Sequence, residues 1–210
     1  MEIKIIEISG EESIKKAAVM PYQTKTQDET KLAYRVWKAG HRSITRHSNI
    51  SIEVKDVSQD ALRQLSRHPH INLTVKSTRY CDFTDTKMFM PAWVEDGLLD
   101  LMSDDFDTIM DIYTKWQKIE QENGQEDTAK LFLPLMSTTD LIMSANIQAM
   151  YEFLMLRNCV RASEEIRIMS HAITEILSKE EGLIGDIFSQ LDCKGKEYGY
   201  CPEHKSCGKY

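Results

Sequence analysis

A dense group of side chains that can bind an anion lies in residues 63–80. It contains arginine, histidine, lysine and hydroxyl side chains, namely Arg63, Arg67, His68, His70, Lys76, Ser77, Thr78 and Arg79. Arginine offers a planar fork of donors that suits phosphate and carbonyl groups, and hydroxyls add neutral donors. The stretch can therefore hold a nucleotide phosphate and read a pyrimidine ring. The alternative is a solvated basic loop, which composition alone favours because most charged runs lie at the surface.

A second group of polar residues interrupts the apolar segments farther along the chain. Lys130 precedes Leu-Phe-Leu-Pro, Asn146 lies inside a long apolar stretch, and Arg157 ends the run Phe-Leu-Met-Leu. Arg157 could instead pair with Glu152 or Glu165 on a helix surface. Asn146 could be a polar residue at a helix interface. Taken singly, these residues do not decide between a binding role and a structural one.

The order of the first group resembles the signature of the flavin-dependent thymidylate synthases. That signature is Arg-His-Arg, seven residues and then Ser. Here residues 67–69 read Arg-His-Pro, and seven residues separate them from Ser77. The family also has Arg-Gln before the signature and Arg-Tyr after it, which match residues 63–64 and 79–80.

Other parts of the chain fit the same resemblance, which extends from residue 32 to residue 208. His47, after a Gly-His pair, resembles a His that follows the family's Gly-His segment. Asn146 and Arg157 resemble the flavin-contacting Asn and the essential Arg of one family helix. Where the family usually has Arg, Glu, Arg, Arg and His, this chain has Pro69, Val75, Lys130, Gln148 and Arg161. His70, next to Pro69, is expected to take over part of the missing arginine's role.

The resemblance implies an enzyme that transfers a one-carbon unit from methylenetetrahydrofolate to carbon 5 of dUMP. Reduced FAD would supply the hydride, and NADPH would reduce the flavin again. Arg157 would be catalytic, since its guanidinium can stabilise negative charge developing on the uracil edge. The residues implied for the nucleotide are Gln64, Arg67, Ser77, Thr78, Arg79, Lys130 and Arg157. Those implied for FAD are His47, Arg67, His68, His70 and Asn146. The resemblance also implies a homotetramer whose sites are shared between chains.

Several alternatives stay open at this point. Ser77 could be a nucleophile only if His68 or His70 reached it as a base, and a binding role is favoured because that geometry is demanding. The departures at Pro69 and Val75 suggest a relative that transfers a hydroxymethyl group without the final reduction. A third reading is a homologue that holds a nucleotide without turnover.

The cysteines raise a separate question at the C-terminus. Four possible zinc ligands lie there, Cys193, Cys201, His204 and Cys207. The usual two-by-two pairing of ligands is missing, so no metal is predicted. Cys81 and Cys159 are expected to be small buried residues. Residues 1–192 are expected to form one domain and residues 193–210 a Cys-rich tail.

These residues need a scaffold, and the hydrophobic patterns predict one. Alternation predicts strands over 2–8 and 48–54. Helical spacing and stop signals predict helices over 10–20, 27–39, 95–122, 126–133, 139–156 and 161–180. Ser58 is expected to cap a further helix that ends by Pro69. The expected fold is α+β, an antiparallel sheet packed against several helices in a single domain.

Composition limits the possible partners. The chain has 210 residues, a net charge of -7 and a pI near 5.4, so its surface does not generally attract nucleic acid or an anionic membrane. No apolar run approaches the roughly 20 residues that span a bilayer. The N-terminus has no signal-peptide core. We therefore expect a cytoplasmic protein with reduced thiols, no nucleic-acid partner and no membrane association.

Overall fold

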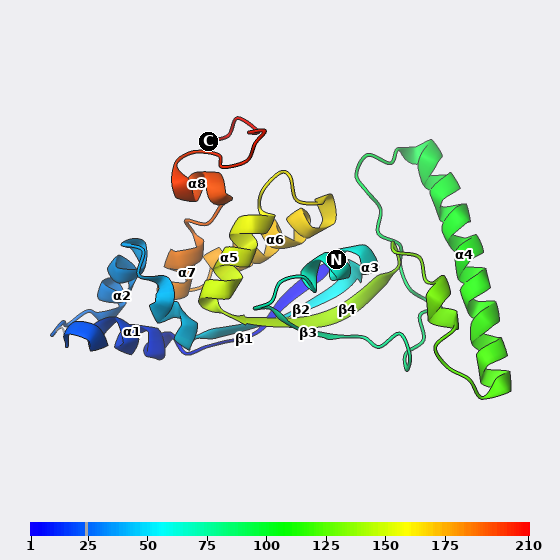
Figure 1. Ribbon diagram of the computed structural model, residues 1–210, viewed down its shortest axis with the longest axis horizontal. Coiled ribbons are helices and arrows are strands. Elements are labelled where there is room, and N and C mark those ends of the chain that lie inside the picture. The colour runs from blue at the N-terminus through cyan, green and yellow to red at the C-terminus, as the bar shows by residue number, and fades with distance from the viewer. Residues whose placement is uncertain (24) are drawn as a thin grey trace.

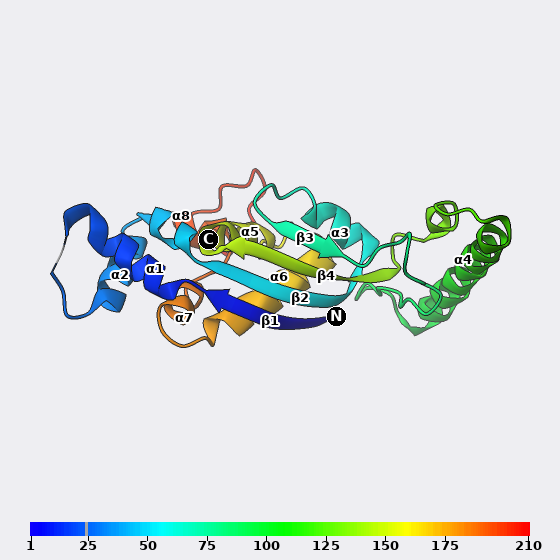
Figure 2. The same ribbon diagram turned by 90° about the horizontal axis from the view of Figure 1, so that it is seen from below.

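A four-stranded antiparallel sheet forms the centre of the computed structural model, which describes residues 1–23 and 25–210 (Figures 1 and 2). The strand order is β1-β2-β4-β3. The strands are β1 (Glu2–Ser9), β2 (Asn49–Ser58), β3 (Asn72–Val75) and β4 (Thr138–Asn146). The sheet therefore joins three widely separated parts of the chain. The predicted α+β class with an antiparallel sheet is confirmed.

The two faces of the sheet differ because successive side chains point to opposite sides. Cross-strand neighbours Ile5, Ile52, Met143 and Leu73 lie on the face that packs into the core. On the other face the matching row is Lys4, Glu53, Ile142 and Thr74. Figure 2 looks onto the sheet from below, with the helices behind it.

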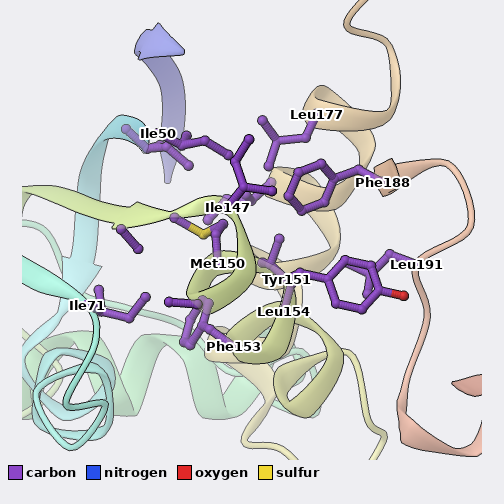
Figure 3. Close-up of a cluster of buried hydrophobic side chains, with 14 of the residues drawn as sticks. Ile50, Ile71, Ile147, Met150, Tyr151, Phe153, Leu154, Leu177, Phe188 and Leu191 are labelled. Carbon is purple, nitrogen blue, oxygen red and sulfur yellow. The ribbon is translucent and has the colours of Figure 1, made fainter. Parts of the chain in front are cut away.

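Three helices supply most of the cover on the buried face. They are α5 (Ile147–Arg157), α6 (Glu164–Ser178) and α7 (Leu183–Phe188). Ile147, Met150 and Leu154 of α5 meet Leu177 and Phe188 in one buried cluster (Figure 3). Because α5 is buried on most sides, the residue at its end, Arg157, is held on a rigid element.

Smaller elements flank this core at one end of the sheet. They are α1 (Glu11–Val19), η1 (Met20–Tyr22), α2 (Glu29–Lys38) and η2 (Arg42–His47). The C-terminal segment, with α8 (Lys194–Tyr198), folds back onto the body. Lys209 Nζ and the Tyr210 hydroxyl contact Asp192 Oδ2 at 2.6 and 2.7 Å. The predicted boundary after residue 192 stays a prediction.

A second, smaller core lies at the opposite end of the molecule. Here the 28-residue helix α4 (Asp96–Asn123) packs against η3 (Ala129–Phe132), away from the main helices (Figure 1). Phe106, Met110 and Tyr113 of α4 surround Phe83 and Ala129. Within the described residues, no helix combines the length and the apolar character needed to cross a membrane.

Several predicted elements are confirmed and two are wrong. Ser58 does cap α3 (Gln59–Leu65), because its hydroxyl accepts from the Ala61 backbone N–H. The helix predicted over 139–156 is wrong in its first half, which forms the central strand β4. Buried Leu141, Met143 and Ala145 alternate there with more exposed residues, a period of two. The helix predicted over 126–133 is only the short η3. The stretch 63–80 contains the whole of β3.

Candidate functional site

Arg157 and His68 form the contact that links the two groups of polar residues. Arg157 lies at the last position of α5, and His68 follows the end of α3. Arg157 Nε donates to His68 Nε2 at 3.0 Å, and Arg157 Nη2 lies 2.8 Å from the same nitrogen. The His68 ring also packs edge-on against Phe153 of α5, with ring centroids 4.8 Å apart. The alternative pairing of Arg157 with Glu152 or Glu165 is wrong.

The surroundings of His68 favour the neutral form of its ring. Burial, and then the positive charge of Arg157, lower the pKa of His68 below its ordinary value. Burial also lowers the pKa of Arg157, and the nearby Arg67 adds to that effect. A neutral imidazole whose Nε2 accepts a hydrogen bond carries its proton on Nδ1. His68 is therefore a neutral acceptor that orients a guanidinium in an electropositive surrounding.

A cleft at the start of α5 collects further donors. It has a volume of about 450 Å³ and is lined by Arg46, His70, Asn146, Gln148, Ala149 and Glu152. Asn146 is also the N-cap of α5, since its side-chain oxygen accepts from the Ala149 backbone N–H at 2.9 Å. Arg46 Nε donates to Gln148 Oε1 at 2.7 Å, and Gln148 Nε2 donates to Glu152 Oε1 at 2.7 Å. This network fixes Arg46 along one wall.

An apolar hollow adjoins that cleft. Its volume is about 150 Å³, and it shares His70, Ala149 and Glu152 with the first cleft. The rest of its wall consists of His68, Pro69, Ile71, Phe153 and Leu156. The two together offer cationic donors at one end and a ring-sized apolar surface at the other. Such a wall suits a ligand that has both phosphates and a flat ring.

A different cleft, beside α4, contains the other predicted nucleotide residues. It has a volume of about 500 Å³, and Thr78, Arg79 and Lys130 lie on its wall. Ser77 begins the turn that leads into it: its hydroxyl accepts from the Arg79 backbone N–H at 3.2 Å, and Cys81 N–H donates to the Ser77 carbonyl at 3.0 Å. The two cations face carboxylates, because Asp127 Oδ1 lies 2.8 Å from Arg79 Nε and 2.6 Å from Lys130 Nζ.

The remaining predicted residues take less central positions. Gln64, on α3, donates to Asp60 and accepts from the Ser163 hydroxyl. Arg67 is exposed just after α3, and His47 is exposed at the end of η2. Among the described residues, neither of these two lines the clefts given above. Their proposed roles in binding stay predictions.

The described chain does not bring the predicted site together in one place. The cleft beside α4 shares no lining residue with the two clefts next to α5. Ser77, Arg79 and Lys130 therefore belong to one group, and His68, His70, Asn146 and Arg157 to another.

Some residues that line the clefts belong to no sequence motif, and some expected roles and positions are not supported. Arg46, Glu126 and Asp127 line the clefts, but no motif singled them out. Ser77 as a nucleophile receives no support, because the Nε2 atom of His68 is engaged by Arg157. Cys81, expected to be buried, is exposed, and Cys159 is half-buried.

The C-terminal cysteines share one small cavity. Cys159, Cys193, Cys201 and Cys207 line a volume of about 90 Å³. Within residues 1–23 and 25–210, no group of three or more His, Cys, Asp or Glu side chains is placed to hold a metal ion. The alternative of a zinc site therefore gains no support from their positions.

The fold and these clefts define a class of protein, an α+β protein whose clefts are lined by both cationic and acidic side chains. The family model for the thymidylate synthase complementing proteins matches residues 4–181. The chain belongs to this family. The matched region contains every predicted nucleotide and flavin residue and stops before the C-terminal cysteines.

Individual relatives agree with that assignment. The flavin-dependent thymidylate synthase of Thermococcus kodakarensis is 30% identical over 176 residues, which is 80% of this chain and 71% of that protein. The enzyme of the same name from Pyrococcus furiosus is 27% identical over 182 residues, with 80% and 71% covered. The fold resembles a crystal structure of thymidylate synthase X from Helicobacter pylori with FAD and dUMP. That match has a TM-score of 0.66 and 23% identity, and covers 90% of this chain and 99% of the other.

Proposed function

We propose that this protein is a flavin-dependent thymidylate synthase that moves a one-carbon unit from methylenetetrahydrofolate to carbon 5 of dUMP. The observation that carries the proposal is the contact between Arg157 and His68. These residues come from separate parts of the family pattern, 89 positions apart. The fold joins them in an electropositive setting at the end of a buried helix. A solvated basic loop would not need such a contact.

Within this proposal, Arg157 acts on the pyrimidine. Its charged fork stabilises negative charge on the uracil edge as carbon 5 becomes nucleophilic. His68 is a positioning residue, because its neutral Nε2 holds the Arg157 side chain and reduces the number of geometries open to it. Ser77, Thr78, Arg79 and Lys130 bind the nucleotide, with Gln64 and Arg67 as further contacts. Lys130 meets phosphate as a point charge, because an ammonium cannot form the two parallel bonds of a guanidinium.

The donors beside α5 suit FAD. Arg46 and His70 can meet phosphates, and Asn146 keeps its amide nitrogen for a ligand while its oxygen caps the helix. Phe153 and Leu156 offer an apolar surface to a ring. His68 and Arg67 from the signature, and His47 on η2, complete the proposed set. When bound, reduced FAD supplies the hydride that turns the transferred carbon into a methyl group. NADPH is the proposed reductant for the flavin.

We further propose a homotetramer in which chains share their sites. Thr78, Arg79 and Lys130 line the cleft beside α4, whereas His68, which contacts Arg157, lines a separate cleft beside α5. A neighbouring copy can supply the missing half. Helix α4 also leaves Leu98, Leu101 and Ile112 at the surface, 48%, 58% and 40% exposed. Apolar residues of this kind on a long helix favour burial against another chain.

The test is the product itself. Purified protein is mixed with FAD, NADPH, methylenetetrahydrofolate and dUMP, and the nucleotide product is identified by mass. Thymidylate supports the proposal. A product heavier than thymidylate by one oxygen would identify a hydroxymethylase, the outcome suggested by Pro69 and Val75. Binding of dUMP without any product would identify a homologue that does not turn over.

A matched variant shows whether the product depends on the proposed site. Arg157→Ala removes the guanidinium from the end of α5, where the side chain is only half-buried, so the helix core is kept. Circular dichroism and the melting temperature check that it is folded. We expect methyl transfer to be lost in the folded variant. Turnover equal to wild type would rule out the role of Arg157.

A further inference from the structure

The two cations in the cleft beside α4 already hold carboxylates of their own chain. Asp127 Oδ1 contacts both of them, at 2.8 Å from Arg79 Nε and 2.6 Å from Lys130 Nζ. Glu126 lies farther away, with Oε2 3.6 Å from Arg79 Nη2. Asp127 therefore bridges the pair, in the way that a phosphate oxygen bound by both side chains would.

The other charges along this cleft also show that the two cations are neutralised by their own chain. Its lining contains the two cations and four carboxylates, Asp82, Glu120, Glu126 and Asp127. Two of the carboxylates are engaged elsewhere. Asp82 accepts from Thr84 and Gln117, and Glu120 accepts from the backbone N–H groups of Thr128 and Ala129. Glu126 and Asp127 are left to neutralise the cations, so an arriving anion meets little free positive charge.

The backbone at Asp127 is unusual as well. Its φ is 82°, in the left-handed region that residues other than glycine rarely adopt, although Asp tolerates it better than most. Such a conformation persists where neighbours hold it in place. Here the cations hold the Asp127 side chain, and the bonds to Glu120 hold the backbone of the two residues that follow. The carboxylate is thus presented to the cations by a constrained turn.

We propose that Asp127 competes with the phosphate of the nucleotide: its carboxylate holds Arg79 and Lys130 before binding and is displaced when the phosphate enters the cleft. This inference rests on the proposed function, because it takes the phosphate of dUMP as the incoming anion. The competition would make the cleft selective for a phosphorylated nucleotide over a nucleoside. A dianionic phosphate can replace one carboxylate at two cations, whereas an uncharged nucleoside cannot.

The test compares two neutral substitutions. Asp127→Asn keeps the size of the side chain and the tolerance for a left-handed backbone, and removes the charge. We expect this variant to bind dUMP about tenfold more tightly than wild type, because Asp127 contacts both cations within 2.8 Å. Deoxyuridine, which has no phosphate, should bind equally to both. Glu126→Gln is the matched control, since Glu126 meets one cation at 3.6 Å and is 58% exposed. It should change the affinity for dUMP by no more than about threefold, as exposed ion pairs contribute little.

Binding is measured by calorimetry with dUMP, deoxyuridine and inorganic phosphate. If folded Asp127→Asn binds dUMP no more tightly than wild type, or more weakly, Asp127 positions the cations and the competition is wrong. If neither protein binds dUMP or deoxyuridine, the proposed function fails. The competition by Asp127 is then judged from the binding of inorganic phosphate. Tighter phosphate binding by Asp127→Asn then supports the competition, and an unchanged or undetectable affinity overturns it.

Discussion

Glu165 gives the sharpest test of how the scaffold is held together. This carboxylate is 5% exposed at the start of α6, and it accepts from the Ser58 backbone N–H at 2.7 Å and from the Ser58 hydroxyl. Glu165→Ala leaves both donors buried and without this partner. An unsatisfied buried group costs about 1–3 kcal/mol. The two donors together would cost up to about 6 kcal/mol, but the hydroxyl can rotate toward another acceptor. We therefore expect the free energy of unfolding to fall by about 2–4 kcal/mol.

For a domain of this size, that loss corresponds to a fall in melting temperature of roughly 4–16 °C. Calorimetry or thermal denaturation followed by circular dichroism measures it. Ser58→Ala is the companion variant, because it removes one of the two donors together with the cap of α3. A fall in melting temperature of less than about 2 °C in Glu165→Ala would refute the assumption that this contact stabilises the fold.

The pH dependence of the same contact has a definite sign. Burial raises the pKa of Glu165 above its ordinary value of 4.5, against the opposing effect of the bonds from Ser58. A group whose pKa is raised by folding contributes its full stability below the unfolded pKa and loses it as pH rises through the folded pKa. The difference in unfolding free energy between wild type and Glu165→Gln should therefore be largest below pH 4.5 and shrink as pH rises from there. A stability difference that grows with pH would show that the hydrogen bonds from Ser58 affect the pKa of Glu165 more than burial does.

Four further predictions concern residues of the proposed site. Arg157→Ala should raise the pKa of His68 toward 6.5, because a nearby positive charge is removed while burial remains; an unchanged NMR titration midpoint would contradict this. Arg157→Lys keeps the charge but loses the fork, so kcat should fall about a hundredfold or more, and wild-type turnover would show that charge alone suffices. Asn146→Ala should cost about 1 kcal/mol in chemical denaturation through the lost cap. Asn146→Asp should keep the cap to Ala149 but weaken FAD binding by charge repulsion, whereas equal FAD titrations would remove Asn146 from the cofactor site.

Local signals in the sequence predicted much of the fold. The alternation in residues 2–8, the cap at Ser58 and the glycine after residue 123 act over a few positions, and each marks a real element boundary. The prediction of one helix over residues 139–156 was wrong because β4 and α5 follow each other without a break and are both largely buried. The two patterns merge into one apolar run, in which a period of two and a buried helix are hard to separate. The cap at Asn146 was the signal that could have divided them.

The site was less predictable than the fold. Motif order placed Arg157 and His68 in the same family pattern, but only the folded chain joins them through α5 and the end of α3. Asp127 belongs to no recognised motif. Its importance comes from a turn that directs its carboxylate at Arg79 and Lys130, and such turns depend on tertiary contacts rather than on composition.

The separate core beneath α4 has a consequence for how the molecule opens. Among the described residues, Phe106, Met110 and Tyr113 belong to a cluster that has no buried member in common with the core over the sheet. A unit stabilised by few apolar contacts of its own can unfold locally while the remainder stays native. Amide hydrogens in α4 should then exchange with solvent sooner than those of the central strands. Any ligand or neighbouring chain that binds only the closed form would slow that exchange by mass action, so the rate at α4 reports occupancy of the cleft beside it.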